Sequence, residues 1–85
     1  MVYVNIPYVV ENDRLDPESV GKELAILNIS EDAKYEAFAA IYHKRPRGVS
    51  FANTNEAMLL ENALYRLGVP YRQTVESDYK YEDLP

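Results

Sequence analysis

The strongest constraint on the fold is a strand–helix–strand pattern between residues 48 and 75. Val49 and Phe51 alternate with small residues, which predicts a short strand over 48–53. Asn53 or Thr54 can cap the helix that follows over 55–67, and Gly68 stands where a left-handed glycine ends a helix. A second strand over 69–75 completes the unit. The apolar residues of the helix recur on one stripe, which consists of Ala57, Leu60, Leu64 and Leu67.

An alternating segment at the N-terminus predicts another strand. Val2, Val4 and Ile6 fall on one side of an extended chain, so we expect a half-buried strand over 2–10. Pro7 has no N–H to donate to a neighbouring strand. The strand is therefore expected at an edge of the sheet, or its pairing is broken at Pro7.

A first helix is predicted over 17–27, after a polar turn at 11–15. Asp16 can cap it, and the proline and glutamate that follow suit the first helical turn. Gly21 weakens this helix by about 1 kcal/mol relative to alanine. Asn28 is a plausible left-handed terminator.

The segment after Ser30 can be interpreted in two ways. Ser30 is a natural N-cap, and four alanines in the next twelve residues favour a helix over 31–43. Residues 34–42 also alternate as a strand would, although alanine is depleted in strands. Helix is the favoured interpretation, and Pro46 ends the element in either case.

Together these elements predict an α+β fold: a small two-layer domain with a mainly antiparallel three-stranded sheet and two or three helices on one face. Residues 1–75 form a single globular domain, and residues 76–85 form an acidic, tyrosine-containing tail. The edges of so small a sheet make a homodimer possible through strand pairing.

The composition excludes several kinds of site. The chain has no cysteine, which removes disulfides and thiolate ligands, and its single histidine makes a zinc site unexpected. The three glycines are too far apart for a phosphate-binding loop, and the serines stand in no nucleophile motif. We therefore expect no catalytic residue, no cofactor and no metal, and a protein that is not an enzyme.

The charge balance bears on the partner. Nine basic and fourteen acidic residues give a net charge of −5. This charge disfavours nucleic acid and anionic membranes as partners. No apolar stretch approaches the about 20 residues of a membrane helix, and no targeting signal precedes the first strand. The expected partner is a protein, and the expected location is the cytoplasm.

Three features carry the predicted contact surface. The first is the basic cluster 43–47, which can contact phosphate or an acidic partner, or can simply form a solubilising turn. The second is the surplus of tyrosines, eight in 85 residues, too many for so small a core. The third is the tail, which can dock as a linear motif or stay mobile. The predicted partner-binding residues are Lys44, Arg45, Arg47, Tyr71, Arg72, Asp78, Tyr79, Tyr81, Glu82 and Asp83.

Residues 49–75 resemble two families of small domains. The run of strand, polar cap, Glu56-Ala57, apolar helix, Gly68-Val69-Pro70 and strand is similar to the small selenium/sulfur carrier-like domains. The cysteine taken to carry chemistry in that family has no counterpart here. The spacing from Glu56 to Gly68 is also similar to the C-terminal domain of the ribosomal stalk protein, whose lysine-rich face is missing. Both resemblances imply a local fold and no activity.

Three functions are compatible with these observations. The first is a non-enzymatic protein-binding module, a regulator or inhibitor encoded by a virus or mobile element, acting on a basic or nucleic-acid-binding partner. The second is a weak RNA-binding module that uses the 43–47 loop. The third is a small-molecule sensor or small enzyme. The acidic charge and the surplus tyrosines favour the first.

Overall fold

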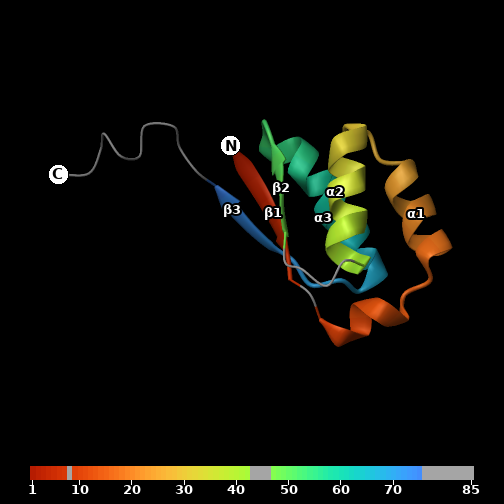
Figure 1. Cartoon of the computed structure of the whole chain (residues 1–85). Coiled ribbons are helices and arrows are strands. Elements are labelled where there is room, and N and C mark those ends of the chain that lie inside the picture. Colours follow the sequence, from red (N-terminus) through yellow and green to blue (C-terminus); the bar gives the residue numbers. More distant parts are fainter. Residues whose placement is uncertain (8, 43–46, 76–85) are drawn as a thin grey trace.

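The computed structural model describes residues 1–7, 9–42 and 47–75, with only the backbone described at Asp13 and Arg47. It is a small α+β domain with one antiparallel three-stranded sheet and three α-helices, as predicted (Figure 1). The elements in chain order are β1 (Val2–Ile6), the 3₁₀ helix η1 (Val10–Arg14), α1 (Pro17–Ala25), α2 (Glu31–Tyr42), β2 (Arg47–Phe51), α3 (Thr54–Leu67) and β3 (Arg72–Val75).

The N-terminal strand is the centre of the sheet. The strand order is β2-β1-β3, and β1 is antiparallel to both neighbours, so that Val4 lies opposite Val49 on one side and Gln73 on the other. The prediction of an edge strand over 2–10 is wrong in position and length. The strand ends at Ile6, so the missing N–H of Pro7 falls outside the ladder. The alternative prediction, that pairing is broken at Pro7, is confirmed.

The strands β2 and β3 are parallel to each other and are separated by β1. The helix α3 connects them, which makes β2–α3–β3 a split β-α-β unit. The strand–helix–strand pattern predicted over 48–75 is thus confirmed, although β3 begins only at Arg72. The predicted polar turn at 11–15 is instead mostly a turn of 3₁₀ helix.

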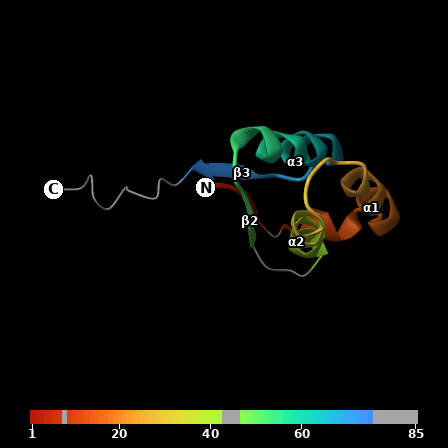
Figure 2. The same cartoon turned by 90° about the horizontal axis from the view of Figure 1, so that it is seen from above.

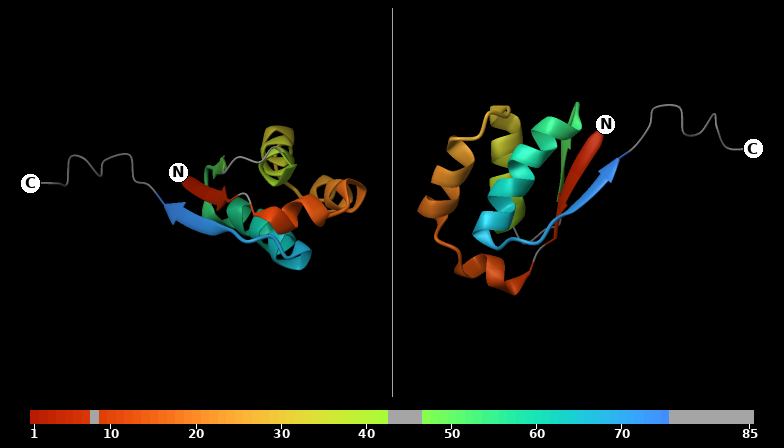
Figure 3. Two further views of the ribbon diagram at one scale, coloured as in Figure 1. Left: turned by 60° about the horizontal axis from the view of Figure 1, so that its bottom comes forward. Right: turned by 180° about the vertical axis from the view of Figure 1, so that it is seen from behind.

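The helices lie on one side of the sheet in two tiers. The helices α2 and α3 pack against the strands, whereas α1 contacts only α2 and α3 among the described elements. Figures 1 and 2 show α1 on the side of these helices that faces away from the sheet, and both views in Figure 3 agree. The sheet therefore keeps one face that none of the described helices covers.

The core lies between the sheet and the helices. The predicted stripe of α3 is confirmed for its first three members, and Leu67 is half-buried against the core. The helix α2 contributes mainly small side chains. The core cluster consists of Val2, Val4, Ile6, Val20, Leu24, Ala33, Ala37, Ala40, Ile41, Val49, Phe51, Ala57, Leu60, Leu64 and Val69.

The helix starts follow from side-chain caps. The Oδ1 atom of Asn53 accepts a hydrogen bond from the N–H of Glu56 at 2.9 Å, and Ser30 Oγ accepts one from the N–H of Ala33 at 3.1 Å. Asp16 caps α1 as predicted. Residues 31–42 are helical, so the helix interpretation of this segment is confirmed. The helix α1 ends earlier than predicted, at Ala25.

Tyr42 connects the C-terminal end of α2 to the segment that precedes α1. Its hydroxyl donates a hydrogen bond to the carbonyl oxygen of Leu15 at 3.0 Å, and its ring lies 4.8 Å from that of Phe38 between centroids. Burial, and to a smaller extent the nearby charge of Asp16, raises the pKa of the Tyr42 hydroxyl above its usual value of 10.0.

The variant Tyr42→Phe is expected to lower the free energy of unfolding by about 1 kcal/mol at neutral pH, because the partly buried carbonyl of Leu15 loses its donor. The raised pKa means that the hydroxyl stabilises the folded state fully below pH 10.0 and that this contribution is lost as the pH rises through the folded-state pKa. Urea denaturation from pH 7 to pH 11 measures both effects. The matched control Tyr65→Phe, at an exposed tyrosine, should not change stability at pH 7. Equal losses of unfolding free energy in the two variants would contradict a stabilising hydrogen bond from Tyr42 to Leu15.

Candidate functional site

Three of the ten predicted partner-binding residues fall within the described ranges. Tyr71 is exposed and lines a shallow pocket beside Tyr65, and Arg72 begins β3 opposite Asn5. Arg47 begins β2 opposite Ile6. The register thus brings Arg47 and Arg72 to the same end of the sheet, on the two strands that flank β1. Lys44, Arg45, Asp78, Tyr79, Tyr81, Glu82 and Asp83 lie outside the described residues, as does the predicted tail 76–85.

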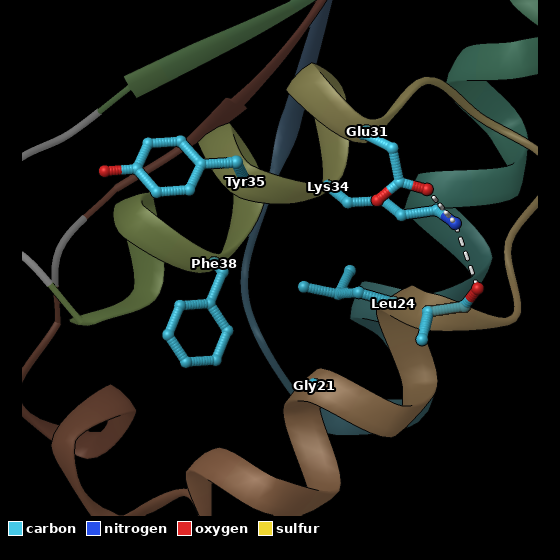
Figure 4. Close-up of a pocket in the computed structure, with 7 residues that line it drawn as sticks. Gly21, Leu24, Glu31, Lys34, Tyr35 and Phe38 are labelled. Carbon is cyan, nitrogen blue, oxygen red and sulfur yellow. Dashed lines mark hydrogen bonds and ion pairs between the residues drawn. The ribbon is translucent and has the colours of Figure 1, made fainter.

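A groove between α1 and α2 forms a concave surface on the helical side. It has a volume of about 380 Å³ and a largely apolar lining. Figure 4 shows that Leu24 of α1 and Phe38 of α2 point into the space between the two helices, with Tyr35 further along the surface of α2. The lining of this α1–α2 groove consists of Gly21, Leu24, Ala25, Glu31, Lys34, Tyr35 and Phe38.

The helix α2 buries small side chains and leaves its first aromatic residue, Tyr35, exposed. It buries Ala33, Ala37 and Ala40 toward the sheet, whereas 64% of the surface of Tyr35 is exposed and Phe38 is only half-buried. A helix stabilised mainly by core packing buries its larger apolar residues and leaves its small or polar residues outside. Ile41 is buried as well, and Phe38 packs against the core while it lines the groove, so Tyr35 is the one aromatic side chain of α2 that the core does not use.

Gly21 keeps the groove open. It lies inside α1, where glycine is less favourable than alanine by about 1 kcal/mol. A Cβ atom at this position would meet no atom within 4 Å, so packing does not require a glycine here. The missing side chain instead leaves the lower part of the groove empty (Figure 4).

The polar end of the groove is formed by Lys34. Its Nζ atom donates to the carbonyl oxygen of Ala25 at 2.9 Å and to Glu31 Oε1 at 3.3 Å, and only 17% of its side chain is exposed. The ammonium group thus satisfies a carbonyl at the C-terminus of α1, where a positive charge is favourable. Glu31 and the exposed Asp32 precede Tyr35 by four and three residues, so they lie beside it on the surface of α2.

Charge is divided between the helices and the sheet. The strands β1, β2 and β3 contain no acidic residue and carry two arginines, Arg47 and Arg72. The acidic residues of the described ranges lie in the helices or at their caps: Glu11, Asp13, Asp16, Glu18, Glu23, Glu31, Asp32, Glu36, Glu56 and Glu61. The described acidic residues thus lie outside the sheet, together with the basic residues Arg14, Lys22, Lys34 and Arg66.

Within the described ranges, no group of three histidine, cysteine or acidic side chains is arranged to hold a metal ion. Nor does that part of the chain contain a helix with the length and apolar character needed to cross a membrane.

The α1–α2 groove was not predicted from the sequence. From the sequence, Gly21 weakens its helix, and Tyr35 is one of eight tyrosines that are too many for so small a core. The available signal was the combination of an unexplained glycine inside one helix with Tyr35 and Phe38, three residues apart, on an alanine-rich neighbouring helix. Recognising that signal requires knowing that the two helices are in contact.

The shape and lining of the α1–α2 groove are the observations that bear on its function. The resemblance of residues 49–75 to carrier-like and stalk-like domains stays a prediction. Comparisons of the chain with protein-family models, with curated proteins and with solved structures give no match.

Proposed function

We propose that the protein is a non-enzymatic protein-binding module whose α1–α2 groove holds a large apolar side chain of a basic partner segment. The observation that carries this proposal is the open apolar groove itself, lined by Phe38 and Leu24 and kept open by Gly21. A buried apolar anchor surrounded by polar contacts is the usual source of affinity in a protein interface.

The acidic residues around the groove favour a basic partner segment. Glu31 lines the groove with 89% of its side chain exposed, and the exposed Asp32 follows it on α2. Lysines or arginines on either side of the anchor residue would meet these carboxylates, and the net charge of −5 would attract such a segment from a distance. The finer expectations stay predictions: a regulator or inhibitor of viral or mobile-element origin, a cytoplasmic location and a homodimer through a sheet edge.

A selection from random dodecapeptides displayed on phage, with the full chain as bait, tests the proposal. The selected peptides should share one leucine, phenylalanine or methionine flanked by lysines or arginines. A synthetic peptide of the consensus sequence should then bind about tenfold more weakly to Gly21→Met, in which a flexible side chain occupies the groove. Because methionine is a better helix former than glycine, this variant should fold at least as stably as the parent.

The matched control is Tyr65→Ala, which removes a tyrosine that is 79% exposed on α3 and does not line the groove. It should bind the consensus peptide with unchanged affinity, whereas Tyr35→Ala should weaken binding several-fold. Amide chemical shifts should change in α1 and α2. Equal binding to the parent and Gly21→Met, or selection of peptides without basic residues, would overturn the proposal.

A further inference from the structure

The face of the sheet opposite the helices is a second surface, independent of the α1–α2 groove. Val2, Val4 and Ile6 are buried beneath the helices, so the alternate residues of β1 point to the other side. Residues paired across strands share a face, which places their partners there too. The outer sheet face consists of Tyr3, Asn5, Gly48, Ser50, Arg72 and Thr74, and none of the described helices covers it.

Asn5 and Gly48 make part of this face flat. The Nδ2 atom of Asn5 donates to the carbonyl oxygen of Arg72 at 3.0 Å and to Thr74 Oγ1 at 2.9 Å. A Cβ atom at Gly48 would lie 2.9 Å from Asn5 Oδ1, too close for a non-bonded contact, and 3.8 Å from Cδ1 of Tyr3. The glycine thus allows the Asn5 amide to lie close to β2, whereas the distance to the Tyr3 ring is that of an ordinary van der Waals contact.

Tyr3 stands at the centre of this face. It lies on the central strand, directly opposite Ser50 on one side and Thr74 on the other. Both neighbours directly opposite are short hydroxyl side chains, and Arg72 of β3 lies diagonally across from the half-buried Tyr3. An aromatic ring on an open sheet, surrounded by small hydrogen-bonding groups, is suited to stacking against a planar ring of a ligand.

The charge of the outer sheet face differs from that of the molecule. It contains no carboxylate, and Arg72 makes no ion pair with any described residue. The acidic residues of α1 and α2 lie beyond the sheet, and salt screens their field with a Debye length of about 8 Å at physiological ionic strength. Glu61 of α3 does contact β3, where it accepts a hydrogen bond from Gln73 at 3.0 Å, but this contact is on the helix-facing side of the sheet. An anionic ligand can therefore approach this face despite the overall charge of −5.

We propose that the outer sheet face binds single-stranded nucleic acid, with a base stacked on Tyr3 and a phosphate contacted by Arg72. The stacking ring favours nucleic acid over an acidic polypeptide, which needs positive charge but no aromatic platform. The binding is weak and salt-dependent, because Arg72 is the only arginine among the described side chains of this face. This surface and the α1–α2 groove face opposite directions, so a nucleic acid and a basic partner protein can be bound together.

Fluorescence anisotropy with a fluorescein-labelled RNA dodecamer of mixed sequence, at 20 to 200 mM salt, tests this proposal on the full chain. The variant Tyr3→Leu should weaken binding at least about fivefold, whereas Tyr3→Phe should retain it. Arg72→Gln should weaken binding and reduce the slope of log K against log salt by about 0.7. Arg14→Gln, at an exposed arginine of η1 that makes no ion pair with a described residue, is the matched control and should bind as the parent does.

Circular dichroism must show that each variant is folded, and Gly21→Met should bind the RNA as the parent does, which separates this surface from the groove. A fluorescein-labelled polyglutamate probe distinguishes the competing occupant. Binding of polyglutamate as tight as that of RNA, with neither affected by Tyr3→Leu, would assign the face to acidic proteins and overturn the proposal. An absence of RNA binding at 20 mM salt would also overturn it.

Discussion

Replacing Leu60 with alanine is expected to lower the free energy of unfolding by about 3 kcal/mol, the largest effect of any substitution considered for this chain. Leu60 is completely buried, and it belongs to the stripe of α3 that packs into the core. The loss combines the lost burial of the side chain with the cavity that remains. A domain of 85 residues has a stability near the lower end of the usual 5–15 kcal/mol, so this change removes a large part of it.

Urea denaturation followed by far-ultraviolet circular dichroism measures this loss. The adjacent Leu59 supplies a matched control, because Leu59→Ala removes the same atoms from a side chain that is 37% exposed. It should lower the free energy of unfolding by less than about 1 kcal/mol. If the two variants lost equal stability, the orientation of α3 against the sheet would be wrong.

The second large effect is expected at Gly68, where alanine should lower the free energy of unfolding by about 1–2 kcal/mol. This residue has a φ of 76°, and its N–H donates to the carbonyl oxygen of Tyr65 at 3.1 Å. The N–H of Val69 donates to the carbonyl oxygen of Leu64 at 2.9 Å, so the helix ends in a Schellman motif. A side chain at this φ is strained, although the space around it is open.

The same substitution at Gly21 provides a control of opposite sign. Gly21 lies within α1, and a Cβ atom there would meet nothing within 4 Å. Gly21→Ala should therefore raise the free energy of unfolding by about 0.5–1 kcal/mol. Thermal and urea denaturation of the two alanine variants under identical conditions makes the comparison. A loss of stability at Gly21, or none at Gly68, would contradict the backbone geometry assigned to these residues.

The sequence predicted local elements well, because their signals are local. Asn53 and Gly68 mark the two ends of α3 by hydrogen bonding and by backbone conformation, and both predictions are confirmed. The alternation of β1 correctly indicated which of its residues are buried. Its central position could not be derived from alternation, since an edge strand that packs on one face has the same pattern. The proline that suggested an edge lies one residue past the ladder.

The candidate surfaces depend on contacts between distant parts of the chain. The α1–α2 groove requires Gly21 and Phe38 to face one space, and the outer sheet face requires Tyr3 to lie between Ser50 and Thr74. The division of charge also becomes visible only after the strands are known. Arg72 was among the predicted contact residues, but its place across from Asn5 follows from the register of β1 and β3.

The central position of β1 has a consequence for how the protein is made. Val4 pairs with Val49 and Gln73, which follow it in the chain by 45 and 69 positions. Ribosomes release a chain from its N-terminus, so the middle strand emerges before both of its partners. The helices α1, α2 and α3 rely on local hydrogen bonds and can begin to form earlier. During synthesis, Val2, Val4 and Ile6 therefore stay exposed until the residues that pair with their strand have been made.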